Sequence, residues 1–257
     1  MKDYTLITGA SSGIGHEFAK LAAKNEQNMV LVARDKSGLE RVKKELAKVS
    51  PELSIEIVAL DLSEPTSAQE LFEHCKINGC NVTTLINNAG FGDYGVFVKS
   101  DLKRQLTMID LNVRTLTELT HLFLPAMVAQ RSGKVMNLGS VASFFPGPLM
   151  SVYFASKNYV LAFSEAIAEE LRGSGVTVTC LCPGSTKTNF GKSAHVSDTH
   201  STANPETTAE DVAMFGWHHM NQGTVVATYG FGNRLSINLA HLLPRSIRVR
   251  LIKRVQK

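Results

Sequence analysis

A phenol and an ammonium group lie four residues apart in the 257-residue chain. Tyr153 and Lys157 stand at positions i and i+4, a spacing that places both side chains on one face of a helix. A positive charge close to a phenol favours the phenolate, so we expect Lys157 to lower the pKa of Tyr153 from its usual value of about 10. Such a pair suits proton transfer at a substrate oxygen. In isolation, the same spacing is more typical of two exposed residues on a helix surface.

Two further polar residues strengthen the proton-transfer interpretation. Ser140 closes an apolar strand-like run. A parallel sheet would bring its hydroxyl to the carboxyl edge, where such folds bind ligands, and there it is placed to hold and polarise a carbonyl group. Asn112 lies within a helical pattern over residues 102–124. Each residue alone also has a simpler explanation, a strand-end turn for Ser140 and a helix kink for Asn112.

A glycine-rich turn near the amino terminus is the second chemical feature. The strand-like residues 4–8 lead into Gly9, Gly13 and Gly15, and a helical pattern follows over residues 16–23. A turn of this kind exposes backbone N–H groups at a helix N-terminus, whose partial positive charge suits a pyrophosphate. The alternative is a tight strand-to-helix turn without a ligand.

The order and spacing of these residues resemble the short-chain dehydrogenase/reductase family over about residues 4–190. The segments that carry the resemblance are Gly9-x-x-x-Gly13-x-Gly15, Asn87-Asn88-Ala89-Gly90, Asn112, Ser140, Tyr153-x-x-x-Lys157 and Pro183-Gly184 with Thr188. The resemblance implies an oxidoreductase that moves a hydride between a nicotinamide nucleotide and a carbonyl or alcohol substrate. It makes Tyr153 the proton donor and gives Lys157 hydrogen bonds to the nicotinamide ribose. It also makes Asn112 the anchor of a water that links Lys157 to solvent.

The end of the second strand-like run predicts which nucleotide binds. Ala33 occupies the position where NAD-dependent relatives usually carry an acid, and Arg34 follows it. A guanidinium group suits bidentate contact with the 2′-phosphate of NADP, so we predict NADP(H) as the cofactor. Two observations point the other way. Asp35 is placed to pair with Arg34, and Ser12 supplies no additional basic charge in the glycine turn.

The predicted cofactor-binding set extends to other strand ends. Asp61 follows the third strand-like run, and the resemblance implies that it hydrogen-bonds the adenine; the alternative is a helix cap, because a helix start follows it. The complete set is Gly9, Ser11, Ser12, Gly13, Ile14, Gly15, Arg34, Asp61, Leu62, Asn88, Ala89, Gly90, Tyr153, Lys157, Pro183, Gly184, Thr186 and Thr188.

The elements that must position these residues alternate along the chain. Strand-like runs are separated by helical patterns, of which the clearest cover residues 39–49, 63–76 and 153–172. This rhythm predicts an α/β fold, a single doubly wound Rossmann-like domain with a seven-stranded parallel sheet and helices on both faces. We place this domain at residues 1–240, with a mobile substrate loop at 190–205. The predicted strands cover residues 4–8, 29–33, 55–60, 85–87, 134–138, 176–181 and 225–229.

The substrate side shows less pattern. Residues 146–150 are apolar and turn-rich, and Phe144, Phe145 and Phe190 add apolar surface near them. We therefore expect a small-molecule carbonyl or alcohol substrate with an apolar body.

Residues 241–257 form a basic amphipathic tail. Ile247, Leu251 and Val255 make an i, i+4, i+8 stripe among arginines and lysines. The stripe favours a helix docked on the body or on a second subunit, with contact to a membrane surface of anionic lipid as the alternative.

Composition and charge exclude several other classes. The net charge of +4 arises in the tail, which has six basic residues and no acid, while residues 1–240 hold 21 basic and 23 acidic ones. This distribution argues against a nucleic-acid-binding face. No apolar run approaches the length of a membrane span, and the strand-like residues begin at Tyr4, so a cytoplasmic protein is expected. Scattered histidines predict no metal site, and we interpret the four cysteines as reduced structural thiols.

Two hypotheses concern the whole molecule. The helical regions 102–131 and 153–172 are expected to join copies into a homo-oligomer, a dimer or tetramer, as they do in relatives of the resembled family. The competing functional hypothesis is a non-catalytic protein that senses NADP(H).

Overall fold

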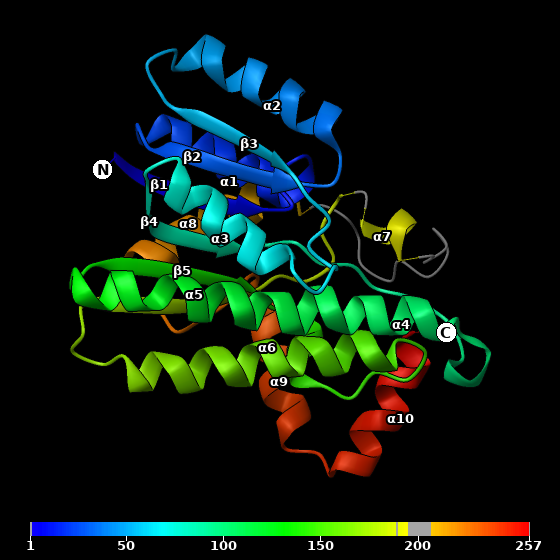
Figure 1. Cartoon of the computed structure of the whole chain (residues 1–257). Coiled ribbons are helices and arrows are strands. Elements are labelled where there is room, and N and C mark those ends of the chain that lie inside the picture. Colours follow the sequence, from blue (N-terminus) through cyan, green and yellow to red (C-terminus); the bar gives the residue numbers. More distant parts are fainter. Residues whose placement is uncertain (1, 189, 195–206, 257) are drawn as a thin grey trace.

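The computed structural model describes residues 2–188, 190–194 and 207–256, apart from the side chains of residues 192 and 193. Its core is one seven-stranded sheet in the order β3-β2-β1-β4-β5-β6-β7, in which all neighbouring strands are parallel (Figure 1). The predicted doubly wound, seven-stranded parallel sheet is therefore confirmed. The strands are β1 (Lys2–Thr8), β2 (Asn28–Ala33), β3 (Ile55–Ala59), β4 (Cys80–Asn87), β5 (Gly133–Leu138), β6 (Val176–Cys182) and β7 (Val226–Thr228).

Helices connect the strands and continue beyond the last one. The α-helices are α1 (Gly13–Lys24), α2 (Lys36–Val49), α3 (Ser67–Ile77), α4 (Leu102–Ile109), α5 (Leu116–Ala129), α6 (Ser151–Glu170), α7 (Phe190–Ser193), α8 (Ala209–Asn221), α9 (Phe231–His241) and α10 (Arg245–Val255). Two short 3-10 turns, Phe97–Lys99 and Val141–Phe144, and a π-helical segment, Asp110–Thr115, complete the described structure.

Alternating side chains of the strands divide the core into two layers. On β2, Met29 and Leu31 join the apolar cluster under α1, α2 and α8, whereas Val30 and Val32 join the cluster under α3, α5 and α6. Successive side chains of a strand point to opposite faces, so a strand that is apolar throughout must be covered on both sides. Figure 1 shows α3 and α5 on one side of the sheet and α1 and α8 on the other.

The chain reverses its winding between β1 and β4, and the carboxyl ends of these neighbouring strands open toward the candidate site. The polar residues at this point have specific partners. The Asn87 amide nitrogen donates to Thr120 Oγ1 at 3.1 Å and to Asn137 Oδ1 at 2.9 Å, and Asn137 donates in turn to Ser164 Oγ at 2.9 Å. This buried chain of hydrogen bonds links β4 and β5 to α5 and α6 behind the site.

Three segments differ most from the sequence predictions. The helix expected from residue 63 begins at Ser67, because Pro65 lies in a turn in which Glu64 N–H donates to Asp61 O and Ser67 N–H to Glu64 O. Strand β4 begins at Cys80 rather than residue 85, since Asn81 and Thr84 interrupt the apolar pattern while the pairing to β1 continues through a register shift between Tyr4 and Thr5. A short helix, α7, occupies residues 190–193 where a loop was expected. The remainder of the expected mobile loop, residues 195–205, lies outside the described residues.

The helix expected over residues 102–124 is divided into α4, the π-helical segment Asp110–Thr115 and α5. Its sequence has the apolar pattern of one continuous helix, and only the wider turn around Asn112 departs from it. Segments of this kind are frequent at functional sites. The interruption therefore marks Asn112 as a residue whose position matters.

Candidate active site

Tyr153 and Lys157 are both buried on α6, facing the carboxyl ends of β5 and β6. The Lys157 nitrogen donates a 2.6 Å hydrogen bond to the Leu138 carbonyl at the end of β5. It lies 5.9 Å from the centre of the Tyr153 ring. The structure thus brings the predicted pair together inside the protein and not on a helix surface.

Burial shifts the pKa of each group away from the ionised form. Burial raises the pKa of Tyr153 to about 12, and a hydrogen bond with Ser140 offsets only part of that rise. In the chain alone the phenol pKa is therefore raised and not lowered as the sequence led us to expect, because desolvation is the largest effect on it. Burial lowers the pKa of Lys157 from 10.5 to about 8. At neutral pH the phenol is thus protonated and the lysine is close to its titration range.

Ser140 lies at the start of the 3-10 turn Val141–Phe144, with its backbone extended. Its hydroxyl oxygen accepts from Ala142 N–H at 3.1 Å, and Ser143 Oγ accepts from Ser140 N–H at 3.1 Å. Val141 N–H also donates to the Pro183 carbonyl at 2.9 Å, which ties the ends of β5 and β6 together. The strand-end turn and the predicted role beside Tyr153 are therefore compatible.

Asn112 is buried in the π-helical segment, and its side chain is fully used by the protein. Its amide nitrogen donates to Phe91 O at 3.0 Å and to Ser156 Oγ at 3.1 Å, and its oxygen accepts from Phe91 N–H at 3.2 Å. Asn112 thus joins the loop after β4 to α6. Its contact on α6 is Ser156, the residue before Lys157. The predicted water anchored by Asn112 stays a prediction.

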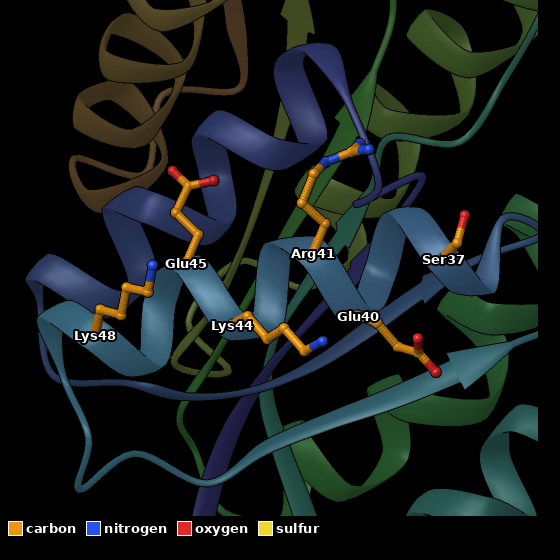
Figure 2. A pocket seen from close by; sticks show the side chains of 6 residues that line it. All are labelled: Ser37, Glu40, Arg41, Lys44, Glu45 and Lys48. Atoms are coloured by element: carbon orange, nitrogen blue, oxygen red, sulfur yellow. The ribbon is translucent and has the colours of Figure 1, made fainter.

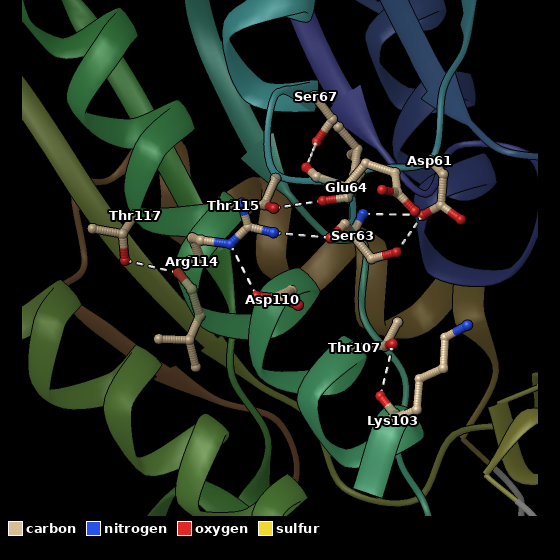
Figure 3. Close-up of polar contacts among 12 residues, drawn as sticks. Asp61, Ser63, Glu64, Ser67, Lys103, Thr107, Asp110, Arg114, Thr115 and Thr117 are labelled. Atoms are coloured by element: carbon tan, nitrogen blue, oxygen red, sulfur yellow. Dashed lines mark hydrogen bonds and ion pairs between the residues drawn. The ribbon is translucent and has the colours of Figure 1, made fainter.

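The turn after β3 holds this segment from the other side. Arg114 donates to Ser63 O at 2.9 Å and to Asp110 Oδ1 at 3.0 Å, and Thr115 Oγ1 donates to the Leu62 carbonyl. Figure 3 shows these contacts converging between the turn and the helix. Two residues predicted to bind the nucleotide, Asp61 and Leu62, are therefore mechanically linked to the segment that carries Asn112.

The glycine turn between β1 and α1 requires glycine at each predicted position. Gly9 and Gly13 have φ values of +68° and +58°. A Cβ atom on Gly15 would lie 2.3 Å from Gly9 O and 2.5 Å from the Asn88 amide nitrogen. Asn88 N–H donates to Thr8 Oγ1 at 3.0 Å, so the segment after β4 is fastened against the turn.

The remaining predicted cofactor residues surround this turn. Ser12 is the residue before α1. A Cβ atom on Gly13 would lie 3.4 Å from Thr188 Cγ2, so the loop after β6 lies over the turn. Thr186 Oγ1 donates to Gly184 O at 3.1 Å and Phe190 N–H to Thr188 Oγ1 at 3.2 Å, contacts that shape this loop. A Cβ atom on Gly90 would lie 3.5 Å from the Lys157 nitrogen. Ser11 lies in the same turn, Ile14 in the first turn of α1 and Ala89 just after β4.

Arg34 and Asp61 meet at the carboxyl ends of β2 and β3. The Arg34 guanidinium lies 3.7 Å from Asp61 Oδ2, and the Arg34 side chain is 70% exposed. Asp35 is not the partner of Arg34; it caps α2 by accepting from Gly38 N–H at 3.0 Å and Ser37 Oγ at 2.7 Å. Burial alone would raise the pKa of Asp61, but hydrogen bonds from Ser63 and the charge of Arg34 hold it below its ordinary value. Asp61 caps this turn and not α3, because α3 begins after Thr66.

Arg41 is a second cation at this end of the site, and the sequence interpretation missed it. It is one of the residues that line a shallow pocket along α2, which are Ser37, Glu40, Arg41, Lys44, Glu45 and Lys48 (Figure 2). Its guanidinium nitrogen donates to the Ser11 carbonyl of the glycine turn at 3.4 Å. The helical period of α2 could have indicated this residue, because Arg41 falls beside the buried Val42 and not on the outermost face.

Apolar side chains from distant parts of the chain enclose the Tyr153 phenol. The Tyr153 ring lies 5.4 Å from that of Phe190 and 6.1 Å from that of Phe154, measured between ring centres. The predicted wall residues Phe144, Phe145 and Met150 belong to this cluster, as do Ile237 of α9 and Ile252 of α10, which the sequence interpretation missed. Among the described residues, no group of three or more His, Cys, Asp or Glu side chains could hold a metal ion.

A nicotinamide dinucleotide fits the residues that this structure brings together. The turn between β1 and α1 is a cradle that side chains at Gly9 or Gly15 would fill, and it presents the N-terminus of α1. Arg34 and Arg41 place positive charge beside it, and the buried Tyr153–Lys157 pair lies at the other end of the same sheet edge. Fold and site together define a dinucleotide-binding oxidoreductase class.

Comparison with known proteins gives the family. Residues 3–198 match the short chain dehydrogenase family, and the chain belongs to that family, which binds NAD(H) or NADP(H). A sulfoacetaldehyde reductase of Chromohalobacter salexigens is 35% identical over 220 residues, which cover 83% of this chain and 86% of that protein. A very-long-chain 3-oxoacyl-CoA reductase of Pyrenophora tritici-repentis is 33% identical over 182 residues, covering 69% of this chain and 53% of that protein. The chain thus spans about half the length of that relative.

The fold comparison agrees. A short-chain dehydrogenase from Sphingobium yanoikuyae in complex with NADPH has a TM-score of 0.83 and 28% sequence identity, with 94% of each chain covered.

Proposed function

We propose that this protein is an NADP(H)-dependent oxidoreductase that reduces a ketone or aldehyde to an alcohol, reversibly, with Tyr153 as the general acid. The observation that carries the proposal is the burial of Tyr153 and Lys157 side by side, with Ser140 hydrogen-bonded to the phenol. When bound, the nicotinamide supplies the hydride to the carbonyl carbon. The chain's own task is to hold the carbonyl oxygen and to give it a proton.

The raised pKa of Tyr153 suits this task. With a pKa of about 12 in the chain alone, the phenol keeps its proton at neutral pH and can donate it to an oxygen that gains charge. The Lys157 ammonium group then stabilises the phenolate left behind, and its own pKa of about 8 lets it return a proton. Asn112 fixes the loop and helix around this relay through Phe91 and Ser156.

The choice of NADP(H) rests on charge. Arg41 contacts the glycine turn and Arg34 lies beside Asp61 at the neighbouring strand ends, and guanidinium groups form strong charge-assisted contacts with phosphate oxygens. The position of Ala33 at the end of β2 removes the acid that would repel a 2′-phosphate there.

An apolar substrate body is supported by the cluster around Tyr153, in which Phe145, Phe154, Phe190 and Ile237 contribute side chains. The relative from Pyrenophora tritici-repentis bears the name of a reductase of very long acyl chains, which is in keeping with such a wall. We propose that catalytic efficiency rises with the apolar length of the carbonyl substrate.

The decisive experiment measures NADPH consumption with ketones and aldehydes of increasing chain length, for the natural sequence and for Tyr153→Phe. We expect the substitution to lower kcat about 1,000-fold while NADPH affinity stays within about twofold, because only the proton donor is lost. Tyr159→Phe is the matched control, since its hydroxyl contacts Thr117 on the far side of α6. Equal turnover by the natural sequence and Tyr153→Phe would refute the assignment of the acid. NADPH binding without consumption of any carbonyl would instead favour the non-catalytic sensor.

We also propose that copies of the chain associate through α4 and α6. The groove between them is lined almost entirely by apolar groups, from Phe97, Ile109, Val113, Val152 and Ala155 among others. Around it, acidic and basic residues alternate, with Asp101, Lys103, Asp110 and Arg114 on the same stretch of chain. Mixed charge beside an apolar groove suits a protein partner of the same composition. A monomer in sedimentation equilibrium at micromolar concentration would contradict this proposal.

A further inference from the structure

The helical pair α9–α10 leaves a row of large apolar side chains uncovered. On α9, Phe231, Leu235 and Leu239 follow the helical period, and Leu242 continues the row just beyond the helix; Phe231 and Leu242 are each 81% exposed. On α10, the stripe of Ile247, Leu251 and Val255 is also exposed, by 41%, 40% and 55%. We call these seven residues the α9–α10 apolar row. The predicted helix does pack on the body, but through Ile252 and not through the predicted stripe, whose contact with a second subunit stays a prediction.

The opposite sides of both helices are the ones that pack on the body. Ile237 of α9 and Ile252 of α10 join the apolar cluster that contains Tyr153. The Tyr94 hydroxyl donates to the Gln256 carbonyl at 2.7 Å, which fixes the end of α10 to the loop after β4. In Figure 1 the two helices stand out from the body below α6. The inner faces are thus held in place while the outer row faces away from the protein.

The charge around this row has one sign. Asp211 is the last acidic residue of the chain, and residues 231–257 contain seven arginines and lysines. Arg250 and Arg254 are exposed and follow the apolar stripe of α10 around the helix. Such a surface is repelled by a second copy of itself, because each copy would bring the same positive charge. The groove between α4 and α6 differs in this respect, since its charges are mixed.

We propose that the α9–α10 apolar row docks on the surface of a membrane rich in anionic lipid. Apolar side chains would enter the boundary between headgroups and acyl chains, while Arg250 and Arg254 would meet lipid phosphates. Among the described residues, no helix is long and apolar enough to cross a bilayer, so the docking would lie in the plane of the interface. This inference concerns binding to lipid and does not depend on the proposed reaction.

The experiment is co-sedimentation of the full chain with vesicles, either of phosphatidylcholine alone or with about one quarter phosphatidylglycerol. We expect binding to the anionic vesicles only, and weaker binding in high salt, because exposed charges are screened. Arg250→Gln with Arg254→Gln should lower the partition coefficient about 30-fold, since each basic residue near an anionic surface contributes about fivefold. Leu235→Ser with Leu239→Ser should lower it at least about tenfold, because less apolar area is buried.

Matched controls distinguish binding through this surface from non-specific binding through exposed charges or exposed apolar side chains elsewhere. Lys43→Gln with Lys44→Gln removes two exposed charges from α2, and Val49→Ser with Ile77→Ser removes two exposed apolar side chains elsewhere. Both controls should bind anionic vesicles as the natural sequence does. The proposal is overturned if neither vesicle sediments the protein, if the controls lose as much binding as the α9–α10 variants, or if Leu235→Ser with Leu239→Ser changes oligomeric state and leaves vesicle binding unchanged. Circular dichroism would verify that each variant is folded.

Discussion

The nucleotide end of the site is formed mainly by main-chain groups, whereas the substrate end is formed by side chains. At the nucleotide end, between β1 and β4, the backbone forms the site: Gly9 and Gly13 have positive φ values, and Asn88 N–H donates a hydrogen bond to Thr8 Oγ1. At the substrate end, side chains form it: apolar groups of α6, α7, α9 and α10 meet around Tyr153. Both arrangements join distant parts of the chain, since Thr8 and Asn88 are 80 positions apart and Tyr153 and Ile252 about one hundred, but the first does so mainly through main-chain atoms and the second through side chains.

This difference sets how each region tolerates change. A backbone site has no free volume, so an added methyl group meets atoms that cannot move. In a wall of apolar side chains, the ends of the side chains can shift by a few tenths of an ångström at modest cost in free energy. The nucleotide end should therefore respond to substitution by losing stability and binding, and the substrate end by changing selectivity.

The sharpest test places the same substitution in both regions. In Gly15→Ala the new methyl would lie 2.3 Å from Gly9 O, and we expect the free energy of unfolding to fall by about 3 kcal/mol. In Gly232→Ala, near the start of α9, no described atom lies within 4 Å of the new methyl. There we expect a gain of about 0.5 kcal/mol from reduced backbone freedom. Urea denaturation of both variants measures the contrast, and two changes of the same sign would contradict it.

Lys157 stands where the two regions meet, and its titration should be visible in stability. Its pKa is about 8 in the folded chain and 10.5 as the ordinary value, so between these pH values the unfolded chain holds a proton that the folded chain has released. Stability from this group therefore rises with pH across that window, at about 1.4 kcal/mol per pH unit at most. Relative to Lys157→Met, we expect the natural sequence to gain about 2 kcal/mol between pH 7.5 and pH 10.

The raised pKa of Tyr153 makes the free energy of unfolding change with pH in the opposite direction. Its stabilising contribution is lost only as pH rises above 10. The raised pKa values of the buried Cys75, Cys80 and Cys182 also act within this window, so it is the comparison with Lys157→Met, which shares these thiols, that isolates the lysine. A difference between Lys157→Met and the natural sequence that stays constant with pH would show that the ammonium group is not buried.

The cationic rim of the nucleotide end should determine the choice between NADPH and NADH. We expect Arg34→Gln to weaken NADPH binding about tenfold and Arg41→Gln about fivefold, since both side chains are partly solvated. NADH binding should change less than twofold in either variant, because it lacks the 2′-phosphate. Arg172→Gln is the control, as that residue pairs with Glu169 at the end of α6. Fluorescence titration gives all these constants. Equal losses for both nucleotides would assign the arginines a structural role.

Sequence alone predicted the fold because the alternation of strands and helices depends on local rules, whereas the catalytic set was assigned from a family resemblance and stays a prediction. The alternation of apolar runs with helical periods, and Tyr153 four residues before Lys157, can be seen without knowing any distant contact. The π-helical segment at Asn112 escaped prediction because its apolar pattern is that of a normal helix. The delayed start of α3 escaped because Pro65 suits the first turn of a helix and also the turn that precedes one.

Other features depend on tertiary packing that no local pattern contains. The direction of the Tyr153 pKa shift follows from desolvation by side chains of several elements that are distant in the sequence. The tail was expected to dock through Ile247, Leu251 and Val255, but Ile252 occupies the contact instead. Both faces of α10 contain apolar residues, so periodicity could not choose between them.

The smallest effect should arise at the rim of the substrate end. A methyl group on Gly92 would lie 3.0 Å from Met150 Cε and 3.1 Å from Phe190 Cζ, the tips of flexible side chains that can yield. We expect Gly92→Ala to leave stability nearly unchanged and to lower kcat/KM about fivefold for the longest carbonyl substrates, with little effect on the shortest, because one methyl group narrows the apolar space. Gly191→Ala on α7 is the control, since no described atom lies within 4 Å of its methyl. A uniform loss across chain lengths would mean that Gly92 serves backbone geometry, which would make the substrate end resemble the nucleotide end after all.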